Sequence, residues 1–174
     1  IGIPYFKKDR ECNMEIIKQL YDINRLFENV DDFGPAYESF LKVSNVELGY
    51  RGLEGRLSEF FEDVRQTAIC IATRGQAGNG DIQFFMSGIK RVKSFMYQEK
   101  YQIEEAITDA SRAAYLATCF EKGILEIEKY PKENPKVVLD MSISEILPTK
   151  LRKLRNVIPE AYYYWAKVDE LLKS

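Results

Sequence analysis

The sequence predicts an all-α protein, folded as an antiparallel bundle of four to five helices with a short C-terminal helical extension. Apolar residues recur at steps of three and four along most of the chain, which is the spacing of one face of an α-helix. Turn-forming residues separate these periodic segments. The apolar share of 45% over 174 residues is enough for the core of one domain.

An extended lead at residues 1–10 is expected to precede the bundle, which is predicted at residues 11–130. Pro35 suits the first turn of a helix, and the glycine-rich run after Thr73 suits the end of one. Pro131 is expected to end the last helix of the bundle. The predicted helices of the bundle are 13–28, a short helix from 35, 53–73, 82–96 and 102–129.

Alanines are frequent in the helix predicted at 102–129. They leave little side-chain bulk, so a neighbouring helix can approach closely there. These alanines are Ala106, Ala110, Ala113, Ala114 and Ala117.

A proline-interrupted linker and C-terminal helices packed on the bundle are predicted at residues 131–174. The run 137–140 is expected to be a short extended piece. Ser142 and Glu145 resemble a capping box, which predicts a short helix reaching Leu147. Pro159 is expected to open the final helix.

The composition excludes many kinds of active site. The chain has no histidine, which is the usual general base near neutral pH and the commonest metal ligand. Histidine-dependent triads, zinc sites and di-iron sites are therefore excluded. We predict a non-enzymatic protein that uses no cofactor and holds no metal ion.

Four carboxylates leave a magnesium-dependent hydrolase as a lesser alternative. They form two pairs, each on one face of a predicted helix, and paired carboxylates on neighbouring helices can hold Mg²⁺. The other interpretation of the first pair is a solvated acidic face that makes ion pairs with Arg56 and Arg65. The four residues are Glu59, Glu62, Glu105 and Asp109.

The cysteines favour a reducing, cytoplasmic location. Cys12, Cys70 and Cys119 are far apart and each lies in a helical pattern, which is typical of reduced core thiols. No apolar run approaches the roughly 18–20 residues of a membrane span, so we expect no membrane association. The net charge of −2 excludes a globally basic nucleic-acid binder.

Two basic segments are candidate binding surfaces for nucleic acid or a partner. The first alternates charge with leucine from 149 to 155 and is followed by aromatic residues; together these offer cations for phosphates and rings for bases. In the other interpretation, Leu151 and Leu154 dock an amphipathic helix and the aromatic residues fill the core. The candidates in this segment are Lys150, Arg152, Lys153, Arg155, Tyr163 and Tyr164.

The second basic segment lies in the helix predicted at 82–96. Its candidates are Lys90, Arg91 and Lys93, to which Lys100 and Arg112 can add. The other interpretation of this charge run is the solvated face of a helix.

These observations predict a non-enzymatic helical interaction module, a subunit or domain of a larger assembly. Its expected partner is another protein or a second copy of the chain. The alternative is a module that binds the nucleic-acid backbone within a ribonucleoprotein complex, for which the two basic segments are the candidates.

Overall fold

The computed structural model describes residues 6–7, 10–50, 57–93 and 101–174, and it confirms the predicted all-α bundle. Short β-strands β1 (Phe6–Lys7) and β2 (Arg10–Glu11) pair antiparallel ahead of the first helix. The α-helices are α1 (Asn13–Asn29), α2 (Gly34–Tyr50), α3 (Leu57–Ala72), α4 (Ile82–Lys93), α5 (Ile103–Glu121), α6 (Leu154–Val157) and α7 (Pro159–Lys173). The 3₁₀-helices are η1 (Pro135–Leu139) and η2 (Thr149–Lys153).

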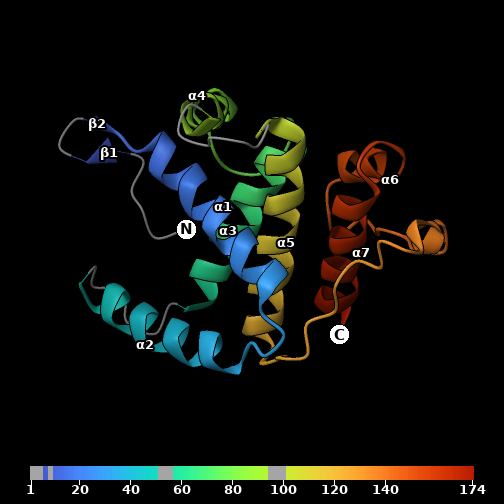
Figure 1. Cartoon of the computed structure of the whole chain (residues 1–174), viewed down its shortest axis with the longest axis horizontal. Helices are drawn as coiled ribbons and strands as arrows, with labels where there is room; N and C mark the ends of the chain where they lie inside the picture. Colours follow the sequence, from blue (N-terminus) through green and yellow to red (C-terminus); the bar gives the residue numbers. More distant parts are fainter. Residues whose placement is uncertain (1–5, 8–9, 51–56, 94–100) are drawn as a thin grey trace.

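Helix α5 is the centre of the bundle and packs against α1, α3 and α7 (Figure 1). It runs antiparallel to α3, because Arg65 of α3 pairs with Glu121 at one end and Arg74 pairs with Glu104 at the other. Helices α1 and α7 run in the same direction as α5 in Figure 1. Helix α1 shares the direction of α5 because the antiparallel α3 lies between them in the chain, and α7 shares it because the long segment 122–158 connects α5 to α7.

Helix α4 crosses α1 at very close range. A Cβ atom added at Gly88 would lie 2.4 Å from the carbonyl oxygen of Asn13, far inside van der Waals contact. Only glycine therefore lets these two helices approach so closely. This contact places α4 across the first turn of α1, at the top of the view in Figure 1, whereas α7 lies on the right.

Helix α5 ends eight residues before the predicted boundary at 129. Gly123 adopts a positive φ of 68°, and the next amide, that of Ile124, donates a hydrogen bond to the carbonyl of Cys119 over 2.8 Å. These are the marks of a Schellman ending, for which glycine is the preferred residue. The prediction was wrong because Ile124 and Ile127 happen to continue the apolar spacing beyond this stop signal.

Other predicted boundaries also change. Helix α2 is not short, since it continues through Gly49 to Tyr50. The run 137–140 is not extended but lies mostly in η1, and the helix predicted to reach Leu147 is absent from the described segment 142–147, which forms a turn instead. Residues 53–56 and 94–96 of two predicted helices lie outside the described ranges.

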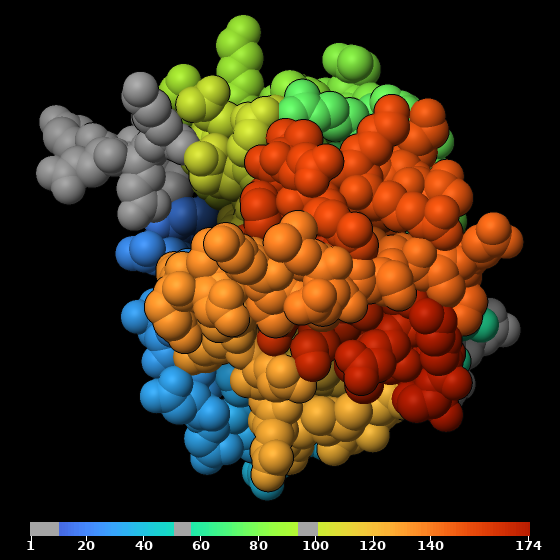
Figure 2. All heavy atoms as spheres, turned by 90° about the vertical axis from the view of Figure 1, so that its right-hand side faces the viewer, coloured from blue at the N-terminus to red at the C-terminus, as the bar shows by residue number. Residues whose placement is uncertain are grey.

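The C-terminal segment is part of the core rather than a peripheral layer. Figure 2 shows residues 131–174 covering one face of the molecule. Beneath this surface Trp165 and Val168 of α7 are fully buried, and Leu151 of η2 is buried with them. Burial of side chains this large contributes roughly 1.5–3 kcal/mol each, so α7 stabilises the bundle as strongly as the helices before it. The three cysteines are also buried, as predicted for core thiols.

Candidate functional site

The basic side chains of the first segment are partly exposed to solvent and partly hydrogen-bonded within the protein. Lys150, Arg152 and Lys153 are exposed on η2, and Arg155 of α6 is half-buried. Arg152 donates from Nε to the carbonyl of Ile143 over 3.0 Å. The four predicted cations therefore do lie together, but at least one also holds the neighbouring loop in place.

Arg155 is anchored more firmly than Arg152. Its Nη2 donates to the carbonyl of Met141 and, over 2.6 Å, to the hydroxyl of Tyr162. The guanidinium also stacks over the Tyr162 ring at 4.8 Å from the centroid. Such a cation–π contact stabilises the pair by about 0.5–2 kcal/mol. Arg155 therefore ties the loop between η1 and η2 to α7.

The predicted stacking tyrosines are inside the protein. Tyr163 and Tyr164 are only 4% and 1% exposed. The hydroxyl of Tyr164 accepts a hydrogen bond from the amide of Tyr130 over 2.9 Å, and its ring meets that of Phe27 edge-on. Their assignment as base-stacking residues was wrong for this conformation, because a base has no access to either ring; the sequence pattern here is that of core aromatic residues.

The second basic segment lies elsewhere on the molecule. Lys90, Arg91 and Lys93 are exposed in the last turn of α4, and Arg91 donates to the side chain of Asn13 over 2.7 Å. Lys100 lies outside the described residues. In Figure 1, α4 and α6 are on opposite sides of α5, so the two basic segments do not form one continuous surface.

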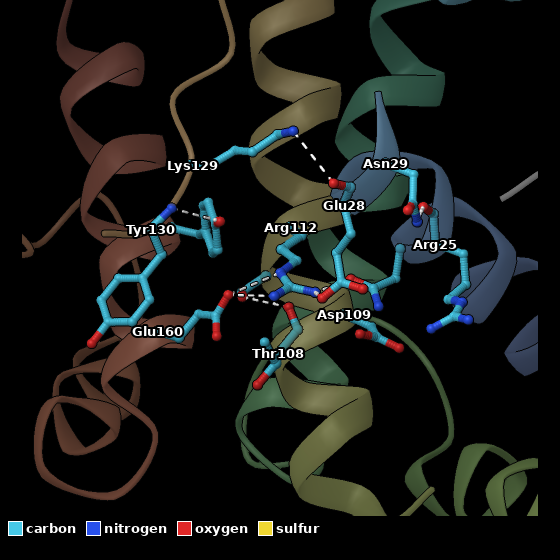
Figure 3. Close-up of polar contacts among 12 residues, drawn as sticks. Arg25, Glu28, Asn29, Thr108, Asp109, Arg112, Lys129, Tyr130 and Glu160 are labelled. Atoms are coloured by element: carbon cyan, nitrogen blue, oxygen red, sulfur yellow. Dashed lines mark hydrogen bonds and ion pairs between the residues drawn. The ribbon is translucent and has the colours of Figure 1, made fainter. Parts of the chain in front are cut away.

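Arg112, the remaining predicted cation, is buried at the junction of α1, α5 and α7 (Figure 3). It pairs with Glu28 of α1 over 3.0 Å and with Glu160 in the first turn of α7, and it also donates to Asn24. Burial alone would lower the pKa of Arg112, but Glu160 and Glu28 raise it above its usual value. We call Arg112, Asn24, Glu28 and Glu160 the Arg112 cluster; it holds three helices together and offers no exposed cation to a ligand.

Asp109 lies one turn before Arg112 and is also buried. Its Oδ2 accepts a hydrogen bond from the hydroxyl of Tyr101 over 2.8 Å. Burial raises the pKa of Asp109 to about 7, although the Tyr101 hydrogen bond and Arg112 act in the opposite direction. Asp109 is thus a structural carboxyl group whose charge changes near neutral pH.

The two carboxylate pairs of the magnesium alternative lie at opposite ends of α5. Glu62 binds Arg65, which also pairs with Glu121 at the C-terminal end of α5. Glu105 instead caps the N-terminal end by accepting from the amide of Gln102. The sixteen residue steps from 105 to 121 correspond to roughly 24 Å of helix. In the described part of the chain, no group of three or more potential ligands is placed to hold a metal ion, and the predicted Mg²⁺ site is not assembled.

An apolar cleft between α1, α2, α3 and α5 was not predicted. It has a volume of about 440 Å³. Its floor is a stripe of α5 on which Ala113 and Ala117 leave space between Leu116 and Phe120. A helix was predicted to pack closely against these alanines. On the side of α5 that faces α2 no helix does so, because the apolar cleft separates α2 from Ala113 and Ala117.

Helix α2 forms the outer wall of the apolar cleft, and its second half combines the buried Ser44 and Leu48 with exposed apolar residues. Tyr37 and Phe40 of its first half contact the ring of Phe120, with centroid distances of 5.1 and 5.8 Å. In its second half, Val43 is 62% exposed and Val46 is 54% exposed. Figure 1 shows this half extending away from α3 and α5. The apolar cleft therefore opens between the second half of α2 and α1.

The rim of the apolar cleft is acidic. Asp22 of α1 and Glu47 of α2 line it, together with the 44% exposed Leu26. Among the described residues that line the cleft, none is basic. The signal for the cleft in the sequence is the presence of apolar side chains at 26 and 43, on the outward side of the helical pattern.

Comparison of the chain with protein-family models, with curated protein sequences and with solved structures finds no match. Across the described ranges, no helix combines the length and the apolar character that crossing a lipid bilayer requires.

Proposed function

We propose that this chain is a non-enzymatic interaction module that receives an amphipathic helix of a partner protein in the apolar cleft. The single observation that carries this proposal is an open cleft whose walls are almost entirely apolar. Its volume falls within the range of about 300–1,000 Å³ typical of ligand sites. Helices commonly bind such grooves through an apolar face.

The charge of the rim defines the partner's chemistry. Asp22 lines the cleft beside Leu26 and Val43, which are partly exposed apolar side chains. A helix with an apolar stripe flanked by lysine or arginine matches both features. A fatty acid matches less well, because its carboxylate would meet the carboxylate of Asp22.

The test uses a fluorescently labelled synthetic helix with leucine at positions i, i+3, i+4 and i+7 and lysine on either side. Fluorescence anisotropy is expected to show saturable binding, which the Val43→Asn variant weakens about tenfold because an apolar contact is lost. Val46→Asn is the matched control, since Val46 is also exposed on α2 but does not line the cleft.

Three outcomes would contradict the proposal. They are the absence of peptide binding, an equal loss of affinity in the Val43→Asn and Val46→Asn variants, and tight binding of a peptide whose flanks are glutamate instead of lysine. The last outcome would show that Asp22 does not select the partner.

The nucleic-acid alternative is supported by the exposed cations of η2, Lys150 and Lys153. The two tyrosines expected to stack on bases, Tyr163 and Tyr164, are buried and do not support it. Its test is anisotropy of labelled single-stranded RNA at low and moderate salt. Binding that falls steeply with salt and disappears on replacement of both lysines by glutamine would favour it; no binding at low salt would end it.

A further inference from the structure

We propose that a polar pocket between the loop 141–143 and α6 binds a single phosphate group, such as that of inorganic phosphate or a nucleoside monophosphate. This Arg152–Arg155 pocket is distinct from the apolar cleft and does not depend on it. Its volume is about 510 Å³. The residues that line it are Ser142, Ile143, Arg152, Arg155, Asn156 and Tyr162.

The two guanidinium groups of the pocket are oriented by the protein itself. A backbone carbonyl accepts from Arg152 Nε, and another accepts from Arg155 Nη2. Tyr162 also holds Arg155 in place, because its ring stacks against the guanidinium and its hydroxyl accepts a hydrogen bond from it. These contacts leave Nη1 and Nη2 of Arg152, and Nε and Nη1 of Arg155, available to an anion. Because the side chains are already placed, an anion would need to order little of the site on binding.

The positive charge of the pocket lacks a carboxylate counter-charge. Within the described residues, neither Arg152 nor Arg155 makes an ion pair. The nearby Asp169 is committed elsewhere, since it accepts from Ser144 and pairs with Lys173. Two cations that line one pocket repel each other, and an oxyanion between them removes that repulsion. Arginine pairs suit phosphate because each fork can donate two parallel hydrogen bonds.

The neutral groups in the pocket point to the same ligand. The side chains of Ser142 and Asn156 are exposed and line the pocket beside the arginines. A hydroxyl and an amide can donate to the remaining phosphate oxygens. The burial of Tyr163 and Tyr164 removes a stacking platform for successive bases, so the pocket fits one phosphate group better than a continuous strand.

The test is an NMR titration of the ¹⁵N-labelled full chain with inorganic phosphate at constant ionic strength. The expected result is saturable shifts of the Ser142, Ile143 and Asn156 amides. Adenosine 5′-monophosphate is expected to shift the same signals and adenosine to leave them unchanged. Equal shifts with adenosine, or unsaturable shifts with phosphate, would overturn the proposal.

Two variants separate the pocket from general surface charge. Asn156→Asp puts a carboxylate into the pocket without touching the carbonyl contacts of the arginines, and it is expected to weaken phosphate binding at least about tenfold. Asn45→Asp makes the same charge change on an exposed position of α2 and is expected to leave binding unchanged. An equal effect of the two variants would contradict a defined site, as would retention of full affinity in Asn156→Asp.

Discussion

The two sides of α5 differ in how completely they are packed. Towards α1 and α7, Arg112 and Tyr115 reach between the helices, and Tyr115 lies 5.6 Å from the ring of Tyr164. Towards α2, Ala113 and Ala117 end short of any partner helix and leave the apolar cleft. The comparison indicates that the first side holds the fold together, whereas the second side is free for binding.

Replacement of Arg112 is expected to give the largest loss of stability, because it removes a cation that α1 and α7 share on the packed side of α5. Arg112→Met leaves Glu28 and Glu160 without their shared cation, and the expected destabilisation is about 3–5 kcal/mol. Urea denaturation measures it. The control is Arg74→Met, which removes an exposed ion pair with Glu104 and should cost at most about 1 kcal/mol. Similar losses in both variants would contradict the structural role of the Arg112 cluster.

The same substitution, alanine to leucine, can be made at a packed position and at an open position of α5, so the two environments can be compared directly. Ala110 is fully buried, whereas Ala117 lines the apolar cleft, although both are on the same stripe of the helix. Ala110→Leu is expected to destabilise by about 2–3 kcal/mol through overpacking, because no space exists for the added methylenes. Ala117→Leu is expected to change the free energy of unfolding by less than about 1 kcal/mol. Thermal and urea unfolding check both, and equal losses would show that the cleft is closed in solution.

A smaller, pH-dependent effect is expected at Asp109 on the packed side. Its raised pKa, about 7, means that the folded state holds the proton that the unfolded state releases near pH 4. Stability contributed by this group therefore falls as pH rises from about 4 to about 7. Glu28, Glu105, Tyr101 and Arg112 face the same carboxyl group, and they do not reverse the direction.

The variant that measures this effect is Asp109→Asn, whose amide oxygen can still accept from Tyr101. It is expected to be more stable than the native chain at pH 8 by on the order of 1 kcal/mol, and about equally stable at pH 4. Urea denaturation at both values provides the measurement. A stability difference that is the same at both pH values would contradict the assigned titration.

The helices were predictable because their signals are local. The apolar spacing of Ile16, Leu20 and Phe27 specifies one face of α1 regardless of what packs on it. The end of α5 was also encoded locally, at Gly123, but two isoleucines beyond it continued the apolar pattern. Boundaries were missed where one local signal opposed another.

The candidate sites were less predictable because they depend on tertiary placement. In the sequence, the buried Arg112 and the exposed Lys90 are both basic residues of a predicted helix. Only the positions of Glu28 and Glu160 in the fold distinguish the two. The apolar cleft depends on the angle at which α2 leaves the bundle, and no residue pattern specifies that angle. The Arg152–Arg155 pocket was partly anticipated, since the basic segment contains both arginines. The carbonyls that orient them come from an irregular loop, and no helical periodicity predicts the position of that loop.

The most direct test of the account is the affinity of the lysine-flanked amphipathic peptide for the Ala117→Leu variant, measured by fluorescence anisotropy. The leucine side chain would occupy the floor of the apolar cleft without destabilising the bundle. The account predicts an affinity at least about tenfold lower than that of the native chain, with unchanged unfolding. An unchanged affinity in a folded variant would contradict it, because the peptide would then bind elsewhere on the molecule.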